Sequence, residues 1–230
     1  SIPAFAEAMA DGGTNRINQT NRTNPNICLI LSITREEQLS TTKIRQMNRI
    51  DYLREGIKNL KTMGTIARSS RQLCKNMVSH VNFTDAELIV ELGAGDGVIT
   101  KYILRKLKPD AKLLVFEVNP KFCMILRQIK DPRLILAEAS AEKLGEYVEK
   151  MGFTKVDYVI SAIPFVVLPK QLGLDIIGKC HDYLKKGGRF VQLHYSLVAK
   201  SIYERIFGNV NISFVPINIP PAFVLVSEKR

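Results

Sequence analysis

Short apolar segments alternate with amphipathic ones along most of the chain, and this alternation restricts the fold more than any other feature of the sequence. Apolar runs rich in β-branched residues predict strands at 87–92, 112–117, 134–137, 156–161 and 189–193. Helical periodicity separates these runs, at 98–107, 120–129, 141–151 and 169–184. Such a pattern is typical of a parallel sheet with helices on both faces.

The C-terminal part departs from this alternation. After a predicted helix at 197–207, two strands follow without a helix between them, at 211–218 and 222–226. Consecutive strands favour a hairpin, so we expect an antiparallel strand at the edge of the sheet. The glycine pair within 185–189 predicts a turn before the fifth strand. We therefore expect an α/β fold with a mostly parallel, seven-stranded sheet.

The N-terminal part has a different composition. Residues 14–26 are mostly Asn, Thr and Arg, which leaves almost nothing to bury and is typical of disordered segments. Met47 stands just before the first amphipathic pattern. We expect residues 1–46 to be a disordered extension or a non-native leader, 47–81 a basic helical segment and 82–230 the main domain.

Positive charge is concentrated in that second segment. The chain carries 33 Lys and Arg against 22 Asp and Glu, a net charge of +11, and residues 43–80 alone carry a net charge of +7. Within a predicted helix at 47–61, the apolar residues form one stripe that cations border: Ile50, Leu53, Ile57 and Leu60. This segment indicates an anionic partner, either nucleic acid or a membrane surface. There are two alternatives. The charges are simply solvated, or the apolar stripe packs on the protein's own core.

The remaining composition excludes several classes of protein. The cysteines and histidines are scattered without the spacing of a zinc site, so we predict no metal. No apolar run approaches the roughly 20 residues that span a bilayer. Residues 1–10 lack the basic start and the sustained apolar stretch of a signal peptide. We expect a cytoplasmic location.

The sharpest local signal is the sequence VELGAGDG at 90–97, where the first strand ends and a helix begins. Alternate glycines allow a tight turn and close approach of a ligand to the backbone, and the helix N-terminus supplies free N–H groups. Glu117 ends the next strand about 20 residues later, where a carboxylate accepts hydrogen bonds from ribose hydroxyls. A nucleotide-like ligand is expected here.

Two ligands compete for this motif. A dinucleotide fingerprint requires a third glycine where the chain has Val98. Glu91 stands two positions before the first glycine, and this arrangement of acidic residue and glycines resembles the first motif of Rossmann-like class I methyltransferases, which use S-adenosylmethionine. This resemblance implies that the loop residues line the methionine part of that cofactor and that the acidic residue lies beneath the loop: Glu91, Gly93, Ala94, Gly95 and Gly97.

Later motifs of the same family follow in order. Ser140 and Ala141, after the third strand, resemble the segment that contacts the adenine base, where Glu138 is the one candidate for the usual acidic residue. The segment SAIPF, which begins at Ser161, stands where amino-group methyltransferases of nucleic acids carry Asn-x-Pro-aromatic. Ala162 replaces the asparagine, and this weakens a nucleic-acid substrate. The resemblance implies that Ser161 also contributes to the cofactor site.

Three segments together resemble the bacterial phospholipid N-methyltransferases: GTIARSSR at 64–71, SAIPF at 161–165 and NIPPAFV at 218–224. The resemblance covers about residues 47–226. It implies N-methylation of an aminolipid headgroup, phosphatidylethanolamine or an ornithine lipid, at the inner face of an anionic membrane, where each Lys or Arg adds about 1 kcal/mol to docking. The alternatives are an rRNA adenine-type methyltransferase and a binding module without catalysis.

Three residues are candidates for contact with the substrate amine. Tyr195 and Phe165 offer aromatic faces for a cationic headgroup. His194 is the one histidine near the predicted catalytic edge, where it could accept the proton of the amine, although a hydrogen-bonded structural role is an equal alternative.

Overall fold

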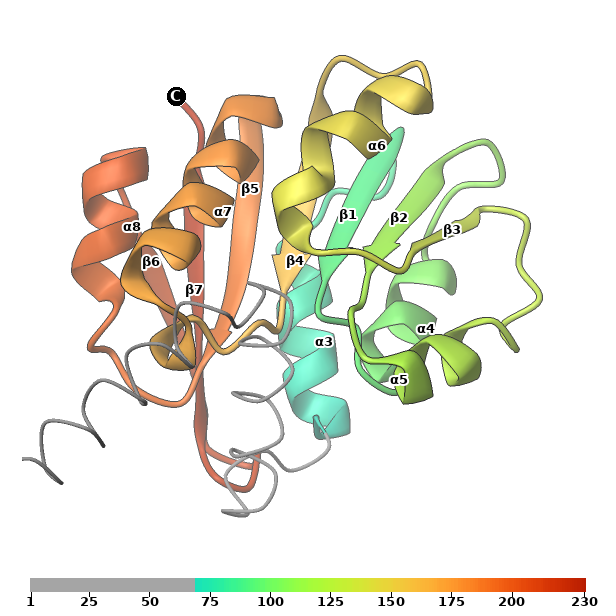
Figure 1. Ribbon diagram of the computed structural model, residues 1–230. Coiled ribbons are helices and arrows are strands. Elements are labelled where there is room, and N and C mark those ends of the chain that lie inside the picture. The colour runs from blue at the N-terminus through green and yellow to red at the C-terminus, as the bar shows by residue number, and fades with distance from the viewer. Residues whose placement is uncertain (1–68) are drawn as a thin grey trace, which may run out of the picture. The chain divides into compact units, whose positions relative to one another are not determined.

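In a computed structural model, residues 69–230 of the chain are described, and they are built around one seven-stranded sheet (Figure 1). The strand order is β3-β2-β1-β4-β5-β7-β6. The strands are β1 Leu88–Leu92, β2 Lys112–Phe116, β3 Leu134–Ala137, β4 Val156–Ser161, β5 Leu184–His194, β6 Asn211–Val215 and β7 Ala222–Glu228. Strands β1 to β5 pair in parallel, and β7 runs antiparallel to both β5 and β6. The predicted mostly parallel sheet is confirmed.

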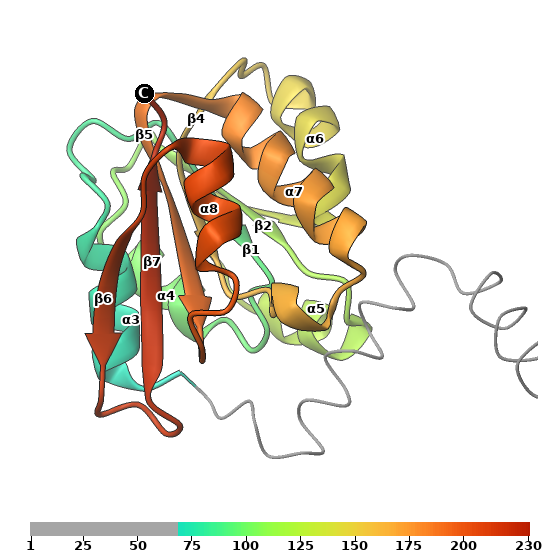
Figure 2. The same cartoon turned by 90° about the vertical axis from the view of Figure 1, so that its left-hand side faces the viewer.

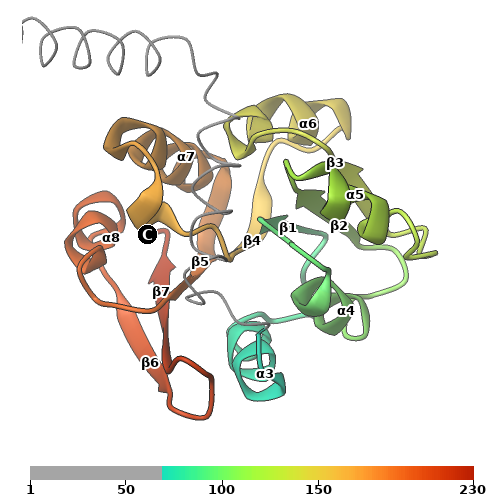
Figure 3. The same ribbon diagram turned by 60° about the horizontal axis from the view of Figure 1, so that its bottom comes forward.

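Helices cover both faces of this sheet, as predicted (Figure 3). They are α3 Arg71–Ser79, α4 Val98–Leu104, α5 Pro120–Leu126, α6 Leu144–Lys150, α7 Lys170–Tyr183 and α8 Lys200–Phe207. Short 3-10 turns, Ala141–Lys143 and Phe165–Val167, precede α6 and α7. Helix α3 lies within the segment 47–81, which was predicted to be helical. The basic helix predicted at 47–61 and the extension at 1–46 lie outside the described residues.

Successive side chains of a strand point to opposite faces of the sheet, so each strand contributes to two hydrophobic cores, one on each face. Leu88, Val90 and Leu92 join the cluster beneath α6, α7 and α8. Ile89, between them, joins the cluster beneath α3 and α4. All five residues of β1 are buried, which is typical of a central strand in a sheet covered on both faces.

The C-terminal hairpin differs from the prediction in one respect. The antiparallel strand β7 is not at the edge, because it lies between β5 and β6, and β6 takes the edge position. The burial patterns explain this arrangement: five of the seven residues of β7 are buried, whereas β6 buries only Val215. An amphipathic edge strand beside an apolar interior strand leaves less hydrophobic surface in water.

The turn predicted at 185–189 is also different. These residues belong to β5 and form a bulge, because Val156 pairs with Leu184 whereas Tyr158 pairs with Arg189. Gly188 passes so close to β4 that a Cβ atom on it would lie 2.8 Å from the carbonyl oxygen of Asp157. Strand β7 stabilises the bulge through a hydrogen bond from Lys229 N to Gly188 O.

The parallel strands give the sheet two distinct edges. The carboxyl ends of β1 to β5 lie at one edge, which we call the carboxyl edge and which is at the bottom of Figure 1. Because His194 pairs with Phe223 at the start of β7, the β6–β7 turn at 216–221 lies at this same edge (Figure 2). The opposite, amino edge holds the starts of β1 to β5.

Candidate functional site

The glycine loop follows β1 at the carboxyl edge. Gly93, Gly95 and Gly97 all have positive φ angles, of 70°, 57° and 76°, which side-chain-bearing residues rarely adopt. A Cβ atom on Gly93 or Gly97 would lie 3.0 Å from the side chain of Ile163 or Leu126, respectively. A Cβ atom on Gly95 would meet nothing within 4 Å. The loop is therefore packed at its two ends and open at Gly95, where a ligand can approach the backbone.

Glu117 follows β2 and contacts the open part of this loop. Its carboxylate accepts hydrogen bonds from the backbone N–H groups of Gly95, Val118 and Asn119, each at 2.8 Å. The side chain is almost fully buried. Since Oε2 accepts only the bond from Gly95, it retains a lone pair for a ligand hydroxyl. The structure thus brings Glu117 and the glycine loop together, as their positions after neighbouring strands require, and the ribose contact stays a prediction.

Glu91 lies beneath the loop in β1 and is 1% exposed. Neither of its carboxylate oxygens has a hydrogen-bond partner. Burial raises the pKa of Glu91 to about 8; the nearby Thr100 on α4 opposes this shift, and the charge of Glu117 adds to it. In the ligand-free protein the group is therefore largely protonated near neutral pH, and a positively charged ligand would favour its ionised form.

The predicted adenine segment forms the 3-10 turn after β3. Ser140 and Ala141 are both buried, and the Ser140 hydroxyl accepts a hydrogen bond from the N–H of Glu142. Glu138, the candidate acidic residue, is bound bidentately by Arg127, with two N–O distances of 2.7 Å. The carboxylate of Glu138 already has strong donors in this arrangement, and its contact with adenine stays a prediction.

At the end of β4, Ser161 is fully buried and its hydroxyl accepts a hydrogen bond from Ile163 N at 3.3 Å. Gln192 of β5 pairs with Ser161 and was not predicted as a site residue. Its side-chain amide donates to the carbonyl oxygens of Ile163 and Leu193, at 2.9 and 2.7 Å, while its own Oε1 has no partner. Gln192 therefore fixes the loop after β4. A single amide within an apolar strand was the available signal.

The two aromatic candidates reach the carboxyl edge from different faces of the sheet. Phe165 is buried in the cluster beneath α6, α7 and α8. Tyr195 is half-buried against the cluster beneath α3 and α4. Burial raises the pKa of Tyr195, and a hydrogen bond with Asn218 opposes this rise. The described residues do not show these two rings on opposite sides of one binding pocket, so their contact with a headgroup stays a prediction.

His194 lies in the core rather than at an open surface. It is 3% exposed, and its Nε2 lies 2.8 Å from the hydroxyl of Tyr203. Burial lowers the pKa of His194 to about 4, so near neutral pH it takes up a proton only weakly. This geometry supports the structural alternative, and the role as a base remains a prediction.

Asn218 joins segments that are far apart in the sequence. Its Oδ1 accepts a hydrogen bond from Ser70 N, at the start of α3, and its Nδ2 donates to Pro220 O. Asn218 is 1% exposed and also neighbours Tyr195. It therefore fixes the β6–β7 turn against α3. The sequence signal was the joint presence of the segments 64–71 and 218–224, although it did not reveal the contact.

Together, the strand order, the glycine loop after β1 and the buried glutamate after β2 define a class I S-adenosylmethionine-dependent methyltransferase. Residues 62–214 match the methyltransferase small domain family, and the chain belongs to this family. The site fits the cofactor, because Gly95 leaves space at the backbone, Glu117 has acceptor capacity and the unpaired Glu91 favours a positively charged ligand.

Relatives act on different substrates. An ornithine lipid N-methyltransferase from Singulisphaera acidiphila is 30% identical over 174 residues, which cover 74% of this chain and 91% of the relative. A ribosomal RNA small subunit methyltransferase A from Thermotoga petrophila is 30% identical over 194 residues, covering 74% of this chain and 68% of the relative. The magnesium protoporphyrin IX methyltransferase of Synechocystis PCC 6803, solved with S-adenosylmethionine, shares the fold, with a TM-score of 0.53 at 13% identity over 80% of this chain and 86% of that one.

Residues 69–230 contain neither a membrane-spanning helix nor a cluster of metal ligands. No helix in this part is long and apolar enough to cross a membrane. No three His, Cys, Asp or Glu side chains in it are grouped so as to hold a metal ion.

Proposed function

We propose that this methyltransferase transfers a methyl group to the amine of an aminolipid headgroup at an anionic membrane surface. The observation that carries the proposal is Ala162, at the end of β4, where adenine-type enzymes place an asparagine that binds the exocyclic amine. A methyl side chain offers no hydrogen bond to such an amine. The similarity to an ornithine lipid N-methyltransferase over 91% of its length supports the same substrate class.

The residues of the carboxyl edge have distinct tasks in this reaction. S-adenosylmethionine, when bound, supplies an electrophilic methyl group. Glu117 and Gly95 would orient the cofactor, and Gln192 fixes the loop after β4, where the substrate amine would lie, through the carbonyl of Ile163. Positioning of this kind accounts for much of the rate in a displacement reaction. Phe165 and Tyr195 provide aromatic surface near the headgroup.

The amine must lose a proton before its lone pair attacks the methyl group. His194 is the base predicted from the sequence. Its low pKa and its contact with Tyr203 favour release of the proton to water instead.

The proposal extends to the N-terminal segments, of which residues 1–68 lie outside the described part of the chain. Residues 47–81 dock the enzyme at the inner face of the membrane, residues 82–230 carry the catalytic domain, and residues 1–46 are an extension without a part in catalysis. Replacement of Arg54, Lys58 and Lys61 by Glu should abolish sedimentation with anionic liposomes and leave S-adenosylmethionine affinity nearly unchanged. Unaltered sedimentation would refute docking by this segment.

The similarity to a ribosomal RNA methyltransferase makes RNA the second candidate substrate. The deciding experiment is a radiolabelled methyl-transfer assay that offers phosphatidylethanolamine or ornithine lipid in anionic liposomes and, in parallel, ribosomal RNA. Label in the lipid fraction is expected. Label only in RNA would overturn the proposal, and binding of S-adenosylmethionine without transfer to any amine would indicate a binding module.

A further inference from the structure

Three loops meet at the carboxyl edge and expose unusually apolar tips. They are residues 162–170 after β4, 195–200 after β5 and 216–221 between β6 and β7, and we call them the apolar rim. Four of their aliphatic side chains are more than half exposed: Val166 (56%), Val198 (84%), Ile217 (72%) and Ile219 (80%). Exposure of aliphatic side chains to water to this extent is unfavourable, and burial of these side chains against a partner would lower the free energy.

The strand registers place these tips beside the cofactor loop. Ser161 pairs with Leu92, so the loop after β4 begins next to the glycine loop. Ser161 also pairs with Gln192, and His194 pairs with Phe223, so the other two loops follow along the same edge. Figure 3, which turns this edge toward the viewer, shows the chain segments after β4 and β5 on that side. A surface that covers the apolar rim therefore covers the mouth of the active site.

The charges of the apolar rim limit the kind of partner. Its three loops contain no Asp or Glu, and their charged residues are Lys170 and Lys200. Lys170 is exposed, and Lys200 pairs with Glu204 one turn further along α8, at 2.6 Å. Apolar tips bordered by lysine match the boundary between headgroups and acyl chains, where aliphatic groups enter the hydrocarbon and ammonium groups remain among the phosphates. An RNA surface would instead require a denser array of cations.

We propose that the apolar rim inserts into the headgroup–acyl boundary of an anionic bilayer, so that the active site opens directly onto the membrane. The proposal rests on the proposed lipid substrate, and it explains how a headgroup reaches the loop after β4, beside the cofactor loop, while its acyl chains remain in the bilayer. It is separate from docking by residues 47–81, because it concerns loops that surround the site itself.

Tryptophan provides a direct test, because the chain contains none. Val198→Trp and Ile219→Trp place single reporters on the apolar rim, and Thr154→Trp places a matched reporter at the exposed amino edge, just before β4. The probe is a vesicle of phosphatidylglycerol and phosphatidylcholine with brominated acyl chains. We expect a blue-shifted, quenched emission from the two reporters of the apolar rim and no change at position 154. Equal responses at all three positions, or none, would overturn the proposal.

A second comparison separates this proposal from the proposed function. Ile219→Asp should reduce partition into the same vesicles at least tenfold, whereas Thr154→Asp, with the same change of charge, should reduce it less than twofold. Methyl transfer from vesicles should fall with partition, while transfer to a water-soluble short-chain aminolipid should remain unchanged. If the unaltered protein methylates no aminolipid, the proposed function fails, and the quenching still reports on insertion. Quenching or spectral shifts caused by ribosomal RNA but not by vesicles would assign the apolar rim to nucleic acid and overturn insertion.

Discussion

Asp157 and Glu91 are both buried carboxylates in the central sheet, yet they lie at opposite edges in opposite surroundings. Asp157, at the amino edge, accepts hydrogen bonds from Glu87 N and Leu88 N, both at 2.8 Å, and forms an ion pair with Lys185. Glu91, near the carboxyl edge, has no hydrogen-bond partner at either oxygen. The first arrangement compensates the charge of Asp157 within the protein, whereas the second keeps Glu91 largely protonated until a positively charged ligand favours its ionised form.

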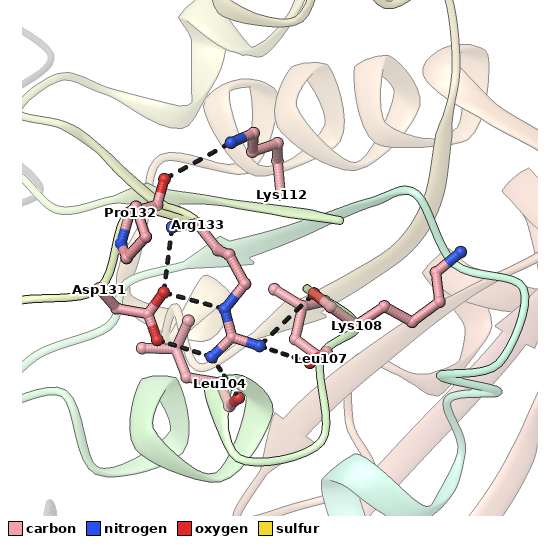
Figure 4. A network of polar contacts seen from close by, with 7 residues as sticks. All are labelled: Leu104, Leu107, Lys108, Lys112, Asp131, Pro132 and Arg133. Carbon is pink, nitrogen blue, oxygen red and sulfur yellow. Dashed lines mark hydrogen bonds and ion pairs between the residues drawn. The ribbon is translucent and has the colours of Figure 1, made fainter. Parts of the chain in front are cut away.

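A second network at the amino edge shows the same compensation (Figure 4). Arg133 donates to both carboxylate oxygens of Asp131, at 2.9 and 2.6 Å, and to the carbonyls of Leu104, Leu107 and Lys108 at the end of α4. The hydrogen bond from Arg133 lowers the pKa of Asp131 to about 2. Hydrogen-bonded groups such as Arg133 thus fix a helix end to the sheet at the amino edge. At the carboxyl edge, hydrogen-bond acceptors such as Glu117 stay available to the cofactor and its substrate.

The largest effect is expected from Glu117→Ala. The variant loses a charged acceptor for a ribose hydroxyl and the bond that orients Gly95, at about 1.5 kcal/mol or more each, so S-adenosylmethionine binding should weaken at least 100-fold. Isothermal titration calorimetry measures this change. Glu146→Ala, at an exposed position on α6, is the control and should have little effect. A loss below about fivefold for Glu117→Ala would contradict the assigned ribose contact.

Asp157→Ala should reduce stability more than any change to the cofactor loop. It leaves the buried N–H of Leu88 without an acceptor and Lys185 without its partner, so we expect a loss of about 3 kcal/mol in the free energy of unfolding. Urea denaturation provides the measurement. Glu91→Gln should instead raise stability at neutral pH, since no hydrogen bond is lost and the folded variant no longer has to keep a carboxyl group protonated. The reverse order would show that the two carboxylates have been interpreted wrongly.

Gly95 and Gly152 form a matched pair across the two edges. Both have positive φ, 57° and 80°, and a Cβ atom on either meets nothing within 4 Å. Substitution of either glycine by Ala should therefore lower the free energy of unfolding by a similar amount, about 1 kcal/mol, which thermal denaturation measures. Only Gly95→Ala should also weaken S-adenosylmethionine binding, by about tenfold or more, because its methyl group enters the ligand space. Similar affinities for the two variants would place the cofactor elsewhere.

The raised pKa of Glu91 gives a smaller, pH-dependent effect. Between about pH 4.5 and 8 the unfolded chain loses this proton while the folded protein retains it, so the stability of the ligand-free protein should fall as pH rises. The slope from this group is at most about 1.4 kcal/mol per pH unit. Denaturation across this range should show the slope in the unaltered protein and its loss in Glu91→Gln. An unchanged slope in the variant would assign it to other groups.

The smallest effect is expected from His194→Gln. Because the imidazole pKa lies near 4, its removal should leave the pH dependence of turnover unchanged above about pH 6. The rate should change by less than about threefold, since Gln can retain a hydrogen bond to Tyr203. Loss of an ionisation from the turnover profile would establish His194 as the base after all.

The sequence predicted those features that depend on local pattern. Strands β1 to β4 match the apolar runs to within one residue at each end, and the contact between Glu117 and the glycine loop follows from the parallel order of β1 and β2. The position of β7 and the bulge in β5 were not predictable, because both depend on pairing between distant strands. Gln192 was missed for the same reason, since its role is set by the carbonyl of Ile163 in the loop after β4.

The contact between α3 and the C-terminal hairpin has a consequence for folding during synthesis. Helix α3 precedes every strand within residues 69–230, but Ser70 N at its start binds Asn218, 148 residues later. Its apolar residues Leu73, Met77 and Val78 belong to the cluster that includes Val224 of β7. On the ribosome, this helix can pack against α4 early, but the part of its apolar face that contacts the hairpin stays uncovered until the last strands emerge. Capture of the nascent chain by a chaperone would protect it during that interval.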